Sequence, residues 1–244
     1  MPIHRNDFKL EDLSHINNLL HALSENARDL LASQLEFILG QKNFQVISAR
    51  NECQAPCPPL DAMATVHFSQ ALGSCFAYID DVVVNPKIQS KGLGTALTSE
   101  LILMAKERGA KWVSLTSAPK RIAANIIYSR LMRHMSDVKV FVLKRANIAT
   151  KDLGIFLDYS GFISAVDTTD VYVVSTLMGR KAFISNDVIK KYSPAAVLEM
   201  VWIAFAKGAE SIEIIVDIQN SVVADLLLQR FFTEKETNVY TLEF

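Results

Sequence analysis

The sequence has few of the residues that mark disulfide-rich, fibrous or membrane-spanning proteins. Only three of its 244 residues are cysteine, nine are glycine and seven are proline. Three cysteines do not complete a disulfide framework and favour a reducing compartment, and so little glycine and proline excludes a collagen-like or disordered chain. No apolar run reaches the roughly 18 residues of a membrane helix, and the first ten residues do not resemble a signal peptide. We therefore expect a globular, cytoplasmic protein with no membrane partner.

The sequence also lacks a large excess of charge of either sign. Its net charge is −1, and half of its residues are hydrophobic, enough for a sizeable core. Without a long basic run, no nucleic-acid partner is expected. Cys53 and Cys57 lie in a proline-rich stretch with no further Cys or His pair nearby. A structural zinc site needs four ligands, so we interpret both as loop cysteines and expect no metal.

The stretch from Ala77 to Ala96 carries the strongest local signal. An apolar, β-branched run predicts a strand over Tyr78–Val84, Asn85-Pro86 predicts a turn, and Gln89-Ser90-Lys91-Gly92-Leu93-Gly94 lies where the next helix should begin. The first turn of a helix presents unpaired N–H groups and the positive end of its dipole, and glycine lets an anion come close. The loop is therefore predicted to bind a phosphate group.

The pattern Q-x-x-G-x-G after such a strand resembles the pyrophosphate loop of the GNAT superfamily of acetyl-CoA-dependent N-acetyltransferases. The neighbouring segments extend the resemblance: Ile79–Val84 upstream is similar to the strand that carries the cofactor, especially in the glucosamine-phosphate branch, and Arg121–Tyr128 downstream, with Asn125 three residues before Tyr128, is similar to the fourth-helix motif. Trp112–Ser117 supplies the strand between them.

The resemblance implies that acetyl-CoA is the co-substrate and that it binds along the strand, the loop and the fourth helix. If the strand splays from its neighbour at a bulge, its backbone groups become free to pair with the pantetheine amides. Alternatively, the valines simply form a buried central strand. The cofactor-binding residues implied are Val82, Val83, Val84, Gln89, Ser90, Lys91, Gly92, Leu93, Gly94, Thr95, Asn125 and Tyr128.

Asp80 and Asp81 are the candidate catalytic bases. Strand geometry turns adjacent side chains to opposite faces, so only one should point into a cleft unless a bulge intervenes. A carboxylate buried among apolar neighbours has a raised pKa and can accept a proton from an ammonium group, directly or through water. The alternative is that one of them caps a turn or pairs with Arg121 or Lys87.

Tyr128 is the candidate general acid. A phenol, with an ordinary pKa of about 10, is protonated at neutral pH and can donate to a departing thiolate. In the family, the matching tyrosine stands near the thioester sulfur. Asn125, one turn earlier on the same helix face, is expected to hydrogen-bond the cofactor arm. The alternative is that Tyr128 is a core aromatic residue.

The expected fold class is α/β (α+β), a mixed, mostly antiparallel sheet flanked by helices, in two tandem domains. Residues 1–145 should form the complete GNAT domain. Residues 146–244 should form a shortened GNAT-like copy, because a weak internal repeat aligns segments near Ala105 and Ala124 with segments near Phe205 and Ala224. This second half has no glycine loop, and Leu228 stands where Tyr128 would be. It should therefore pack or gate the site rather than catalyse.

The expected activity is transfer of an acetyl group from acetyl-CoA to a primary amine by direct attack in a ternary complex. The acceptor, a small molecule or a protein amine, is not readable from the sequence, nor is the choice between an acetyl and a longer acyl group. The chain could act as a monomer, with its halves as an internal pseudo-dimer, or as a homodimer. The alternative function is a non-catalytic CoA-binding or interaction module, which would not need Asp80, Asp81 and Tyr128.

Overall fold

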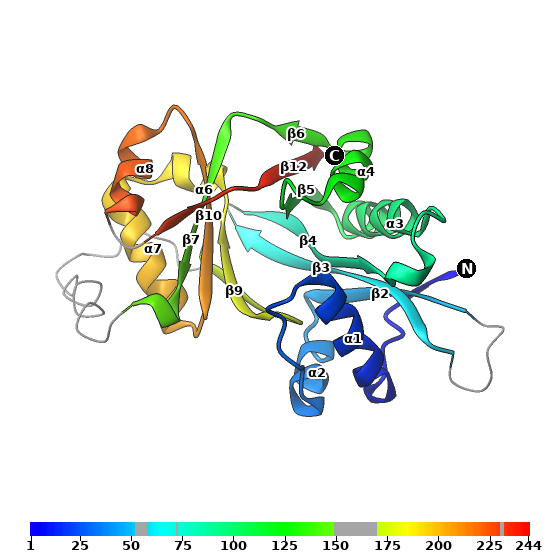
Figure 1. The fold of residues 1–244 in the computed structure, drawn as a ribbon. Helices are drawn as coiled ribbons and strands as arrows, with labels where there is room; N and C mark the ends of the chain where they lie inside the picture. The colour runs from blue at the N-terminus through cyan, green and yellow to red at the C-terminus, as the bar shows by residue number, and fades with distance from the viewer. Residues whose placement is uncertain (52–57, 72, 149–169, 230–231) are drawn as a thin grey trace.

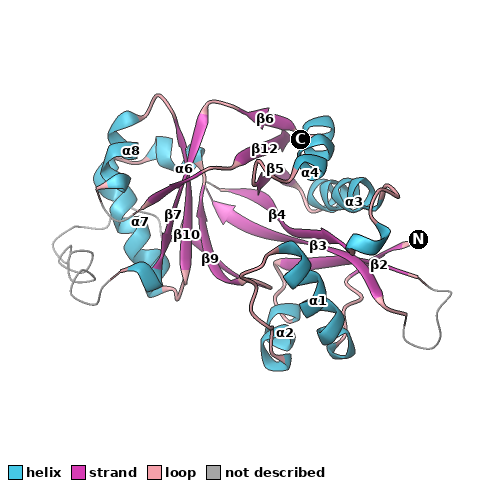
Figure 2. Ribbon diagram, viewed as in Figure 1, coloured by secondary structure: helices cyan, strands magenta, loops and turns pink. Residues whose placement is uncertain are grey.

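The computed structural model describes residues 1–51, 58–71, 73–148, 170–229 and 232–244, so Cys53 and Cys57 lie outside the described part. Two mixed, mostly antiparallel sheets form the framework (Figures 1 and 2). In order across the first sheet, the strands are β1 (Ile3–Arg5), β2 (Phe44–Arg50), β3 (Leu60–Ala71), β4 (Ser74–Val84), β5 (Ala110–Ser117), β12 (Asn238–Glu243) and β6 (Arg133–Met135). Across the second sheet they are β11 (Thr233–Lys235), β7 (Val138–Lys144), β10 (Ser211–Asp217), β9 (Gly179–Ile184) and β8 (Tyr172–Thr176). The expected α/β fold class, with mostly antiparallel sheets flanked by helices, is confirmed.

Helices cover both faces of the first sheet and one face of the second (Figure 1). The α-helices are α1 (Leu13–Leu23), α2 (Ala32–Leu39), α3 (Leu93–Glu107), α4 (Ile122–Leu131), α6 (Asn186–Lys191), α7 (Pro194–Ala206) and α8 (Ser221–Leu228), and the short 3-10 helices are η1 (Leu10–Asp12), η2 (Pro86–Ile88) and η3 (Arg145–Asn147). Pairs of helices pack against opposite faces of the first sheet, α1 with α2 and α3 with α4, while α6, α7 and α8 pack against the second sheet.

Alternation along β4 lets one strand serve two cores. Ala77 and Ile79 face the core under α3, whereas Phe76 and Tyr78 belong to the core of the second sheet. Tyr78 stacks on Phe183 of β9 with ring centroids 5.1 Å apart. Because successive strand residues point to opposite faces, this contact brings the second sheet against the face of β4 that does not carry α3.

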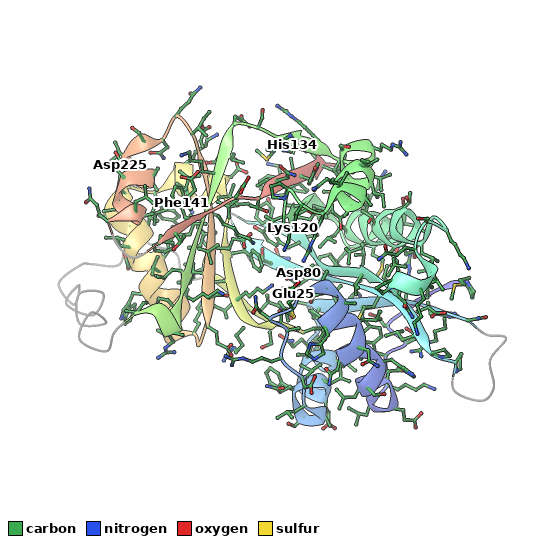
Figure 3. The ribbon with its side chains drawn as sticks, viewed as in Figure 1. Glu25, Asp80, Lys120, His134, Phe141 and Asp225 are labelled. Atoms are coloured by element: carbon green, nitrogen blue, oxygen red, sulfur yellow. The ribbon has the colours of Figure 1, made fainter. Side chains whose placement is uncertain are left out.

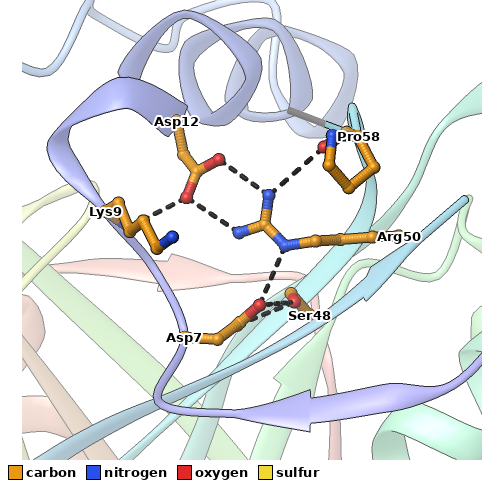
Figure 4. Close-up of polar contacts among 6 residues, drawn as sticks. All are labelled: Asp7, Lys9, Asp12, Ser48, Arg50 and Pro58. Atoms are coloured by element: carbon orange, nitrogen blue, oxygen red, sulfur yellow. Dashed lines mark hydrogen bonds and ion pairs between the residues drawn. The ribbon is translucent and has the colours of Figure 1, made fainter. Parts of the chain in front are cut away.

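An arginine at the end of β2 fixes the N-terminal segment over the sheet (Figure 4). The Arg50 guanidinium donates from Nη1 and Nη2 to the two Asp12 oxygens at 2.7 and 2.8 Å, and from Nε to Asp7 Oδ2 at 2.8 Å. Burial alone would raise the pKa of the Asp12 carboxyl, but the hydrogen bonds from Arg50 outweigh it and the pKa is lowered. This bidentate pair anchors the start of α1, whose far end reaches the site described below.

Local contacts set the bounds of the first elements of the chain. β1 ends at Arg5, because Asn6 has a φ of 51° and turns the chain. α2 begins only at Ala32. The backbone of Leu30 is held instead by the Asn17 side chain, whose Oδ1 accepts from the Leu30 N–H at 2.9 Å and whose Nδ2 donates to its carbonyl at 3.2 Å.

The strands do not divide between the sheets at residue 145. β7 precedes that residue but lies in the second sheet between β10 and β11, and β12 returns from the C-terminal end to lie between β5 and β6. The division into domains at residues 1–145 and 146–244 stays a prediction, and two such domains would have exchanged strands.

The second half reproduces the element order of the repeat. Along the chain, α7 connects the parallel strands β9 and β10, just as α3 connects the parallel strands β4 and β5. Another helix follows each second strand: α8 follows β10, and α4 follows β5. α7 begins at a serine cap followed by proline: the Ser193 hydroxyl accepts from the Ala196 N–H at 3.3 Å, and Pro194 is the first helical residue. That this half is a shortened GNAT-like domain stays a prediction.

Candidate active site

The candidate site lies where β4 and β5 separate. The two strands pair in parallel from Cys75 with Ala110 to Tyr78 with Ser114, yet β4 continues to Val84 and β5 to Ser117. Beyond Tyr78 the two strands no longer pair, so backbone groups on that edge of β4 have no partner in β5. An open strand edge is the kind of surface to which an extended chain with amide groups can add. Val82, Val83 and Val84, the predicted cofactor-binding valines, occupy this segment, and they also pack into the hydrophobic cores.

A β-bulge in β4 explains how both aspartates reach one cavity. The register between β3 and β4 shifts between Met63 and Thr65, so that Asp81 and Val82 together oppose a single β3 residue. Asp81 has a φ of 51°, in the left-handed region that non-glycine residues rarely adopt. Such strain costs on the order of 1–3 kcal/mol and is often found at functional sites. The bulge breaks simple alternation, and Asp80 and Asp81 both line the cavity.

Asp80 is paired with a cation from the second sheet, not with Arg121 or Lys87. Lys181 Nζ on β9 lies 2.8 Å from Asp80 Oδ2. Burial alone favours the neutral acid, but the charge and hydrogen bond of Lys181 outweigh it and lower the pKa of Asp80. Burial would likewise lower the pKa of Lys181, whereas the charges of Asp80 and Asp81 raise it. Asp80 is therefore a fixed anion at neutral pH.

Asp81 has the opposite protonation preference. Its side chain is buried, and burial together with repulsion from the neighbouring Asp80 raises the pKa of its carboxyl to about 7. The Thr65 hydroxyl, on the facing strand, lies 3.5 Å from Asp81 Oδ2. A carboxyl group with a pKa near neutrality can both accept and release a proton at physiological pH, which is the property of a general base.

Tyr128 lines the same cavity from α4. Its ring packs against Tyr240 of β12 at 5.6 Å between centroids, and its side chain is buried. Burial raises the pKa of the Tyr128 phenol to about 12, so the hydroxyl keeps its proton at neutral pH. The structure thus brings together the three predicted catalytic residues, which come from two different elements.

The predicted phosphate loop is open. Gly92 caps α3 with a φ of 78°, and a Cβ built on it would have no heavy atom within 4 Å. The first bond of the helix runs from the Ala96 N–H to the Gly92 carbonyl at 3.0 Å, so the amides of Leu93, Gly94 and Thr95 precede the bonded turns. The open Cβ position at Gly92 leaves room for an anion to approach the backbone there.

The residues around Gly92 show how the loop is held. Gln89 Nε2 donates to the Val84 carbonyl at 3.3 Å, tying the loop to the end of β4. Ser90 has a φ of 67° and, with Lys91, is exposed. Gly94 faces α4, where an added Cβ would lie 3.1 Å from Ile127 Cδ1. A side chain at position 94 would therefore press on the end of Ile127, which would have to shift by a few tenths of an ångström.

The Asn125 side chain hydrogen-bonds the loop before α4. Its Nδ2 donates to the carbonyls of Ala118 and Pro119 at 3.0 and 3.2 Å, and its Oδ1 accepts from the Tyr240 hydroxyl at 3.3 Å. These bonds hold the connection between β5 and α4, and thereby the position of Tyr128. Its expected bond to the cofactor arm stays a prediction.

The second sheet contributes a wall of the cavity that the sequence interpretation did not name. Its polar side chains alternate with apolar ones: Glu213 stands between Ile212 and Ile214, and Lys181 precedes Ala182. The apolar partners pack under α6, α7 and α8, which leaves the polar set toward β4. The alternation in Ser211–Asp217 can be recognised in the sequence and predicts a strand with one polar face. The sequence does not show that this face lines the cavity.

The cavity measures about 350 Å³, at the small end of ligand pockets. Figure 3 shows Asp80 near the middle of the molecule and Glu25 just beyond the end of α1. Leu23 and Ser24 close that side, where the Leu23 carbonyl accepts from Arg121 Nη2 at 3.0 Å. Polar and charged lining residues are Ser24, Asp80, Asp81, Ser114, Thr116, Arg121, Tyr128, Lys144, Lys181, Ser211, Glu213, Lys235 and Thr237.

No group of side chains suited to a metal ion occurs among the described residues, and no helix there is long and apolar enough to cross a membrane.

Comparison with solved structures places the fold. A glucosamine N-acetyltransferase region of a fungal multi-domain β-N-acetylglucosaminidase superposes with a TM-score of 0.55 and 12% identity, over 99% of this chain and 38% of that protein. An aminoglycoside acetyltransferase from an uncultured soil metagenomic sample (23% identity, TM-score 0.46, 53% of this chain and 85% of that chain) and an acetyltransferase of Trypanosoma brucei (22%, 0.45, 53% and 91%) match over about half of the chain.

Part of the sequence matches a known protein family. Residues 29–132, from just before α2 to the end of α4, match the Acetyltransferase (GNAT) family. The chain therefore carries a GNAT acetyltransferase domain, which contains the splayed strands, the loop at Gly92 and Tyr128. No curated protein matches the sequence.

The pair of Lys181 with Asp80 yields a stability prediction. Lys181→Met should lower the free energy of unfolding by roughly 2 kcal/mol, less than the 3–5 kcal/mol of a fully buried pair because a quarter of each side chain is exposed. The loss should shrink in acid, where the unpaired Asp80 becomes protonated. Urea unfolding at pH 7 and pH 4 measures both. Lys190→Met, which removes an exposed pair with Asp217 at 3.5 Å, should change stability by less than about 1 kcal/mol. Equal losses in the two variants would contradict the assignment.

Proposed function

We propose that the chain is an N-acetyltransferase that transfers an acetyl group from acetyl-CoA to a primary amine. The observation that carries the proposal is the pairing, in one cavity beside an open strand edge, of a carboxyl group with a pKa near 7 and a phenol that stays protonated. A protein that only bound CoA would have no use for two groups of opposite proton affinity at that place. Acetyl-CoA supplies the activated acetyl thioester.

The chain's own residues would hold the co-substrate at two places. The amides of Leu93, Gly94 and Thr95, at the positive end of α3, favour the negative diphosphate, and the unpaired edge of β4 near Val82 and Val84 offers backbone groups to the amides of the pantetheine arm. These contacts fix the thioester near the aspartates, which replaces a collision between two molecules with a reaction between positioned groups.

Proton transfer is divided between Asp81 and Tyr128. Asp81 takes a proton from the acceptor ammonium, directly or through a water molecule, so that the amine has a free electron pair. As the new N–C bond forms and the C–S bond breaks, the Tyr128 hydroxyl gives its proton to the departing sulfur. Burial is the main cause of the raised pKa of Asp81, and Asp80, held ionised by Lys181, raises it further by repulsion.

CoA binding tests the loop independently of turnover. Gly92→Val should weaken the affinity for CoA at least about tenfold, since a branched side chain would stand where the diphosphate approaches the helix amides. Isothermal titration calorimetry with CoA measures the change.

Gly109→Val is the matched control, because Gly109 also has a positive φ (73°) with no atom near an added Cβ, but lies just beyond the other end of α3. Both variants bear similar backbone strain, and only Gly92→Val should lose CoA. Normal CoA binding by Gly92→Val would mean that the diphosphate lies elsewhere. Thiol release from acetyl-CoA with a panel of small amines then tests the transfer itself.

A further inference from the structure

We infer that Glu213 and Thr237 form a hydroxyl-binding wall of the acceptor cavity, so that the acceptor is a small primary amine bearing hydroxyl groups, of the amino alcohol or amino sugar class. The inference rests on the proposed function for the site of transfer, but its evidence comes from the second sheet and the segment before β12. It gives the C-terminal part of the chain a role in selecting the acceptor.

Two buried polar atoms on this wall have no partner among the described residues. Glu213 Oε2 accepts from Lys235 Nζ at 3.0 Å, while Glu213 Oε1 is buried and unbonded, and so is the hydroxyl oxygen of Thr237. Both residues line the cavity. Buried polar groups in proteins are almost always hydrogen-bonded, and two exceptions in residues that line one cavity indicate groups that a ligand can satisfy once these side chains adjust to it.

The local fold keeps Glu213 pointing at the cavity. Its strand neighbours Ile212 and Ile214 are fully buried on the helix side of the second sheet, so alternation turns Glu213 the other way. Lys235 of β11 restrains one carboxylate oxygen and leaves the other toward the interior. The carboxylate therefore has a fixed orientation before any ligand binds.

The charges around the cavity decide which polar group fits. Four cationic side chains line it, Arg121, Lys144, Lys181 and Lys235, against three carboxyl groups, of which Asp81 ionises only near pH 7. A second ammonium group on the acceptor would be repelled by these lysines, and an anionic group would be repelled by Glu213. A neutral hydroxyl group meets neither repulsion: it can donate to Glu213 Oε1 and exchange a hydrogen bond with Thr237.

Ring-matched acceptors test the inference. Glucosamine carries hydroxyl groups around its ring, cyclohexylamine has none, trans-1,4-diaminocyclohexane adds a cation and 4-aminocyclohexanecarboxylate adds an anion. We expect kcat/KM for glucosamine to exceed that for each of the other three by at least about tenfold, roughly the contribution of one to two hydrogen bonds. A preference for the diamine, the carboxylate or the bare ring would overturn the inference.

Variants place the preference on this wall. Thr237→Val, of equal size, and Glu213→Gln should each reduce kcat/KM for glucosamine by about tenfold, while leaving cyclohexylamine and the affinity for CoA unchanged. Glu234→Gln is the control, because Glu234 is on the same short strand as Lys235 but pairs with Lys139 and does not line the cavity. Equal losses for glucosamine and cyclohexylamine would overturn the inference.

Calorimetric titration of the CoA-loaded protein with the same four amines separates the two proposals. If no amine releases thiol but glucosamine still binds more tightly than cyclohexylamine, and Thr237→Val removes the difference, the hydroxyl wall stands and the transferase proposal fails. If thiol is released and glucosamine shows no advantage in binding or turnover, the transferase proposal stands and the wall is wrong.

Discussion

Asp81→Asn is expected to abolish most turnover and to stabilise the protein at the same time. Loss of a general base lowers kcat by roughly 10²–10⁴-fold. Stability should rise at pH 8, because the wild-type protein must keep Asp81 ionised in a buried site beside the negative Asp80. An amide of similar shape carries no charge into that site. Few substitutions combine these two effects, so the double outcome is specific to a residue whose pKa is raised for function.

The pH dependence gives the sign of the stability effect. The folded protein binds the Asp81 proton until about pH 7, whereas the unfolded chain releases it near pH 4. Between these values stability falls as pH rises, and above pH 7 the loss is complete. The gain in Tm of Asp81→Asn over wild type should therefore be small at pH 5 and largest at pH 8. Scanning calorimetry at both pH values measures it.

Asp80→Asn is the contrasting control for Asp81→Asn. The pKa of Asp80 is lowered, so its charge stabilises the fold at neutral pH through Lys181, and this contribution is lost only as pH falls below about 4. Its removal should lower the Tm at pH 8, leaving Lys181 without its partner. A fall in Tm for both variants, or normal turnover in Asp81→Asn, would refute the division of roles between the two aspartates.

Tyr128→Phe is expected to lower kcat by roughly 10- to 1,000-fold while the affinity for CoA stays the same, because only the proton donor is removed. The burial that raises the pKa of Tyr128 to about 12 also shapes the pH profile. In the wild type, kcat should rise through pH 7 as Asp81 ionises and remain level to about pH 10, with no falling limb from the phenol. Steady-state kinetics from pH 5 to 10 test this.

Tyr240→Phe is the matched control for Tyr128→Phe. The Tyr240 ring packs against that of Tyr128 at a tilt of 59°, and its hydroxyl donates to Asn125, but Tyr240 does not line the cavity. Its loss should lower stability and leave kcat within about threefold of wild type, since one hydrogen bond contributes roughly 1 kcal/mol. If Tyr128→Phe turned over as fast as Tyr240→Phe, Tyr128 would have no part in the reaction.

The parts of the site that sequence predicted are those set by local rules. The strand ending at Val84, the turn at Asn85-Pro86 and the helix beginning beside Gly92 follow from residue preferences within about 20 positions, and the structure has all three. Tyr128 was predicted from a family-like spacing on one helix face. Each of these signals is contained in one continuous stretch of chain.

The parts that sequence could not predict depend on contacts between distant segments. The different proton affinities of Asp80 and Asp81 arise from a bulge in β4 and from Lys181, about a hundred residues later in the chain. The alternation around Glu213 predicts a strand with one polar face, but which strands flank it and what that face meets are decided by long-range pairing. A sequence pattern shows which face of a strand is polar more reliably than it shows which strands pair with it.

The crossing of β7 and β12 between the sheets has a consequence for how the chain can be cut. A fragment ending at residue 145 would deprive β7 of both its strand partners and bare the side of β5 that β12 covers. Unprotected strand sides of this kind recruit other chains. β7 and β12 thus join the N-terminal and C-terminal parts of the chain, and a fragment of either part would expose strand edges that are paired in the whole chain.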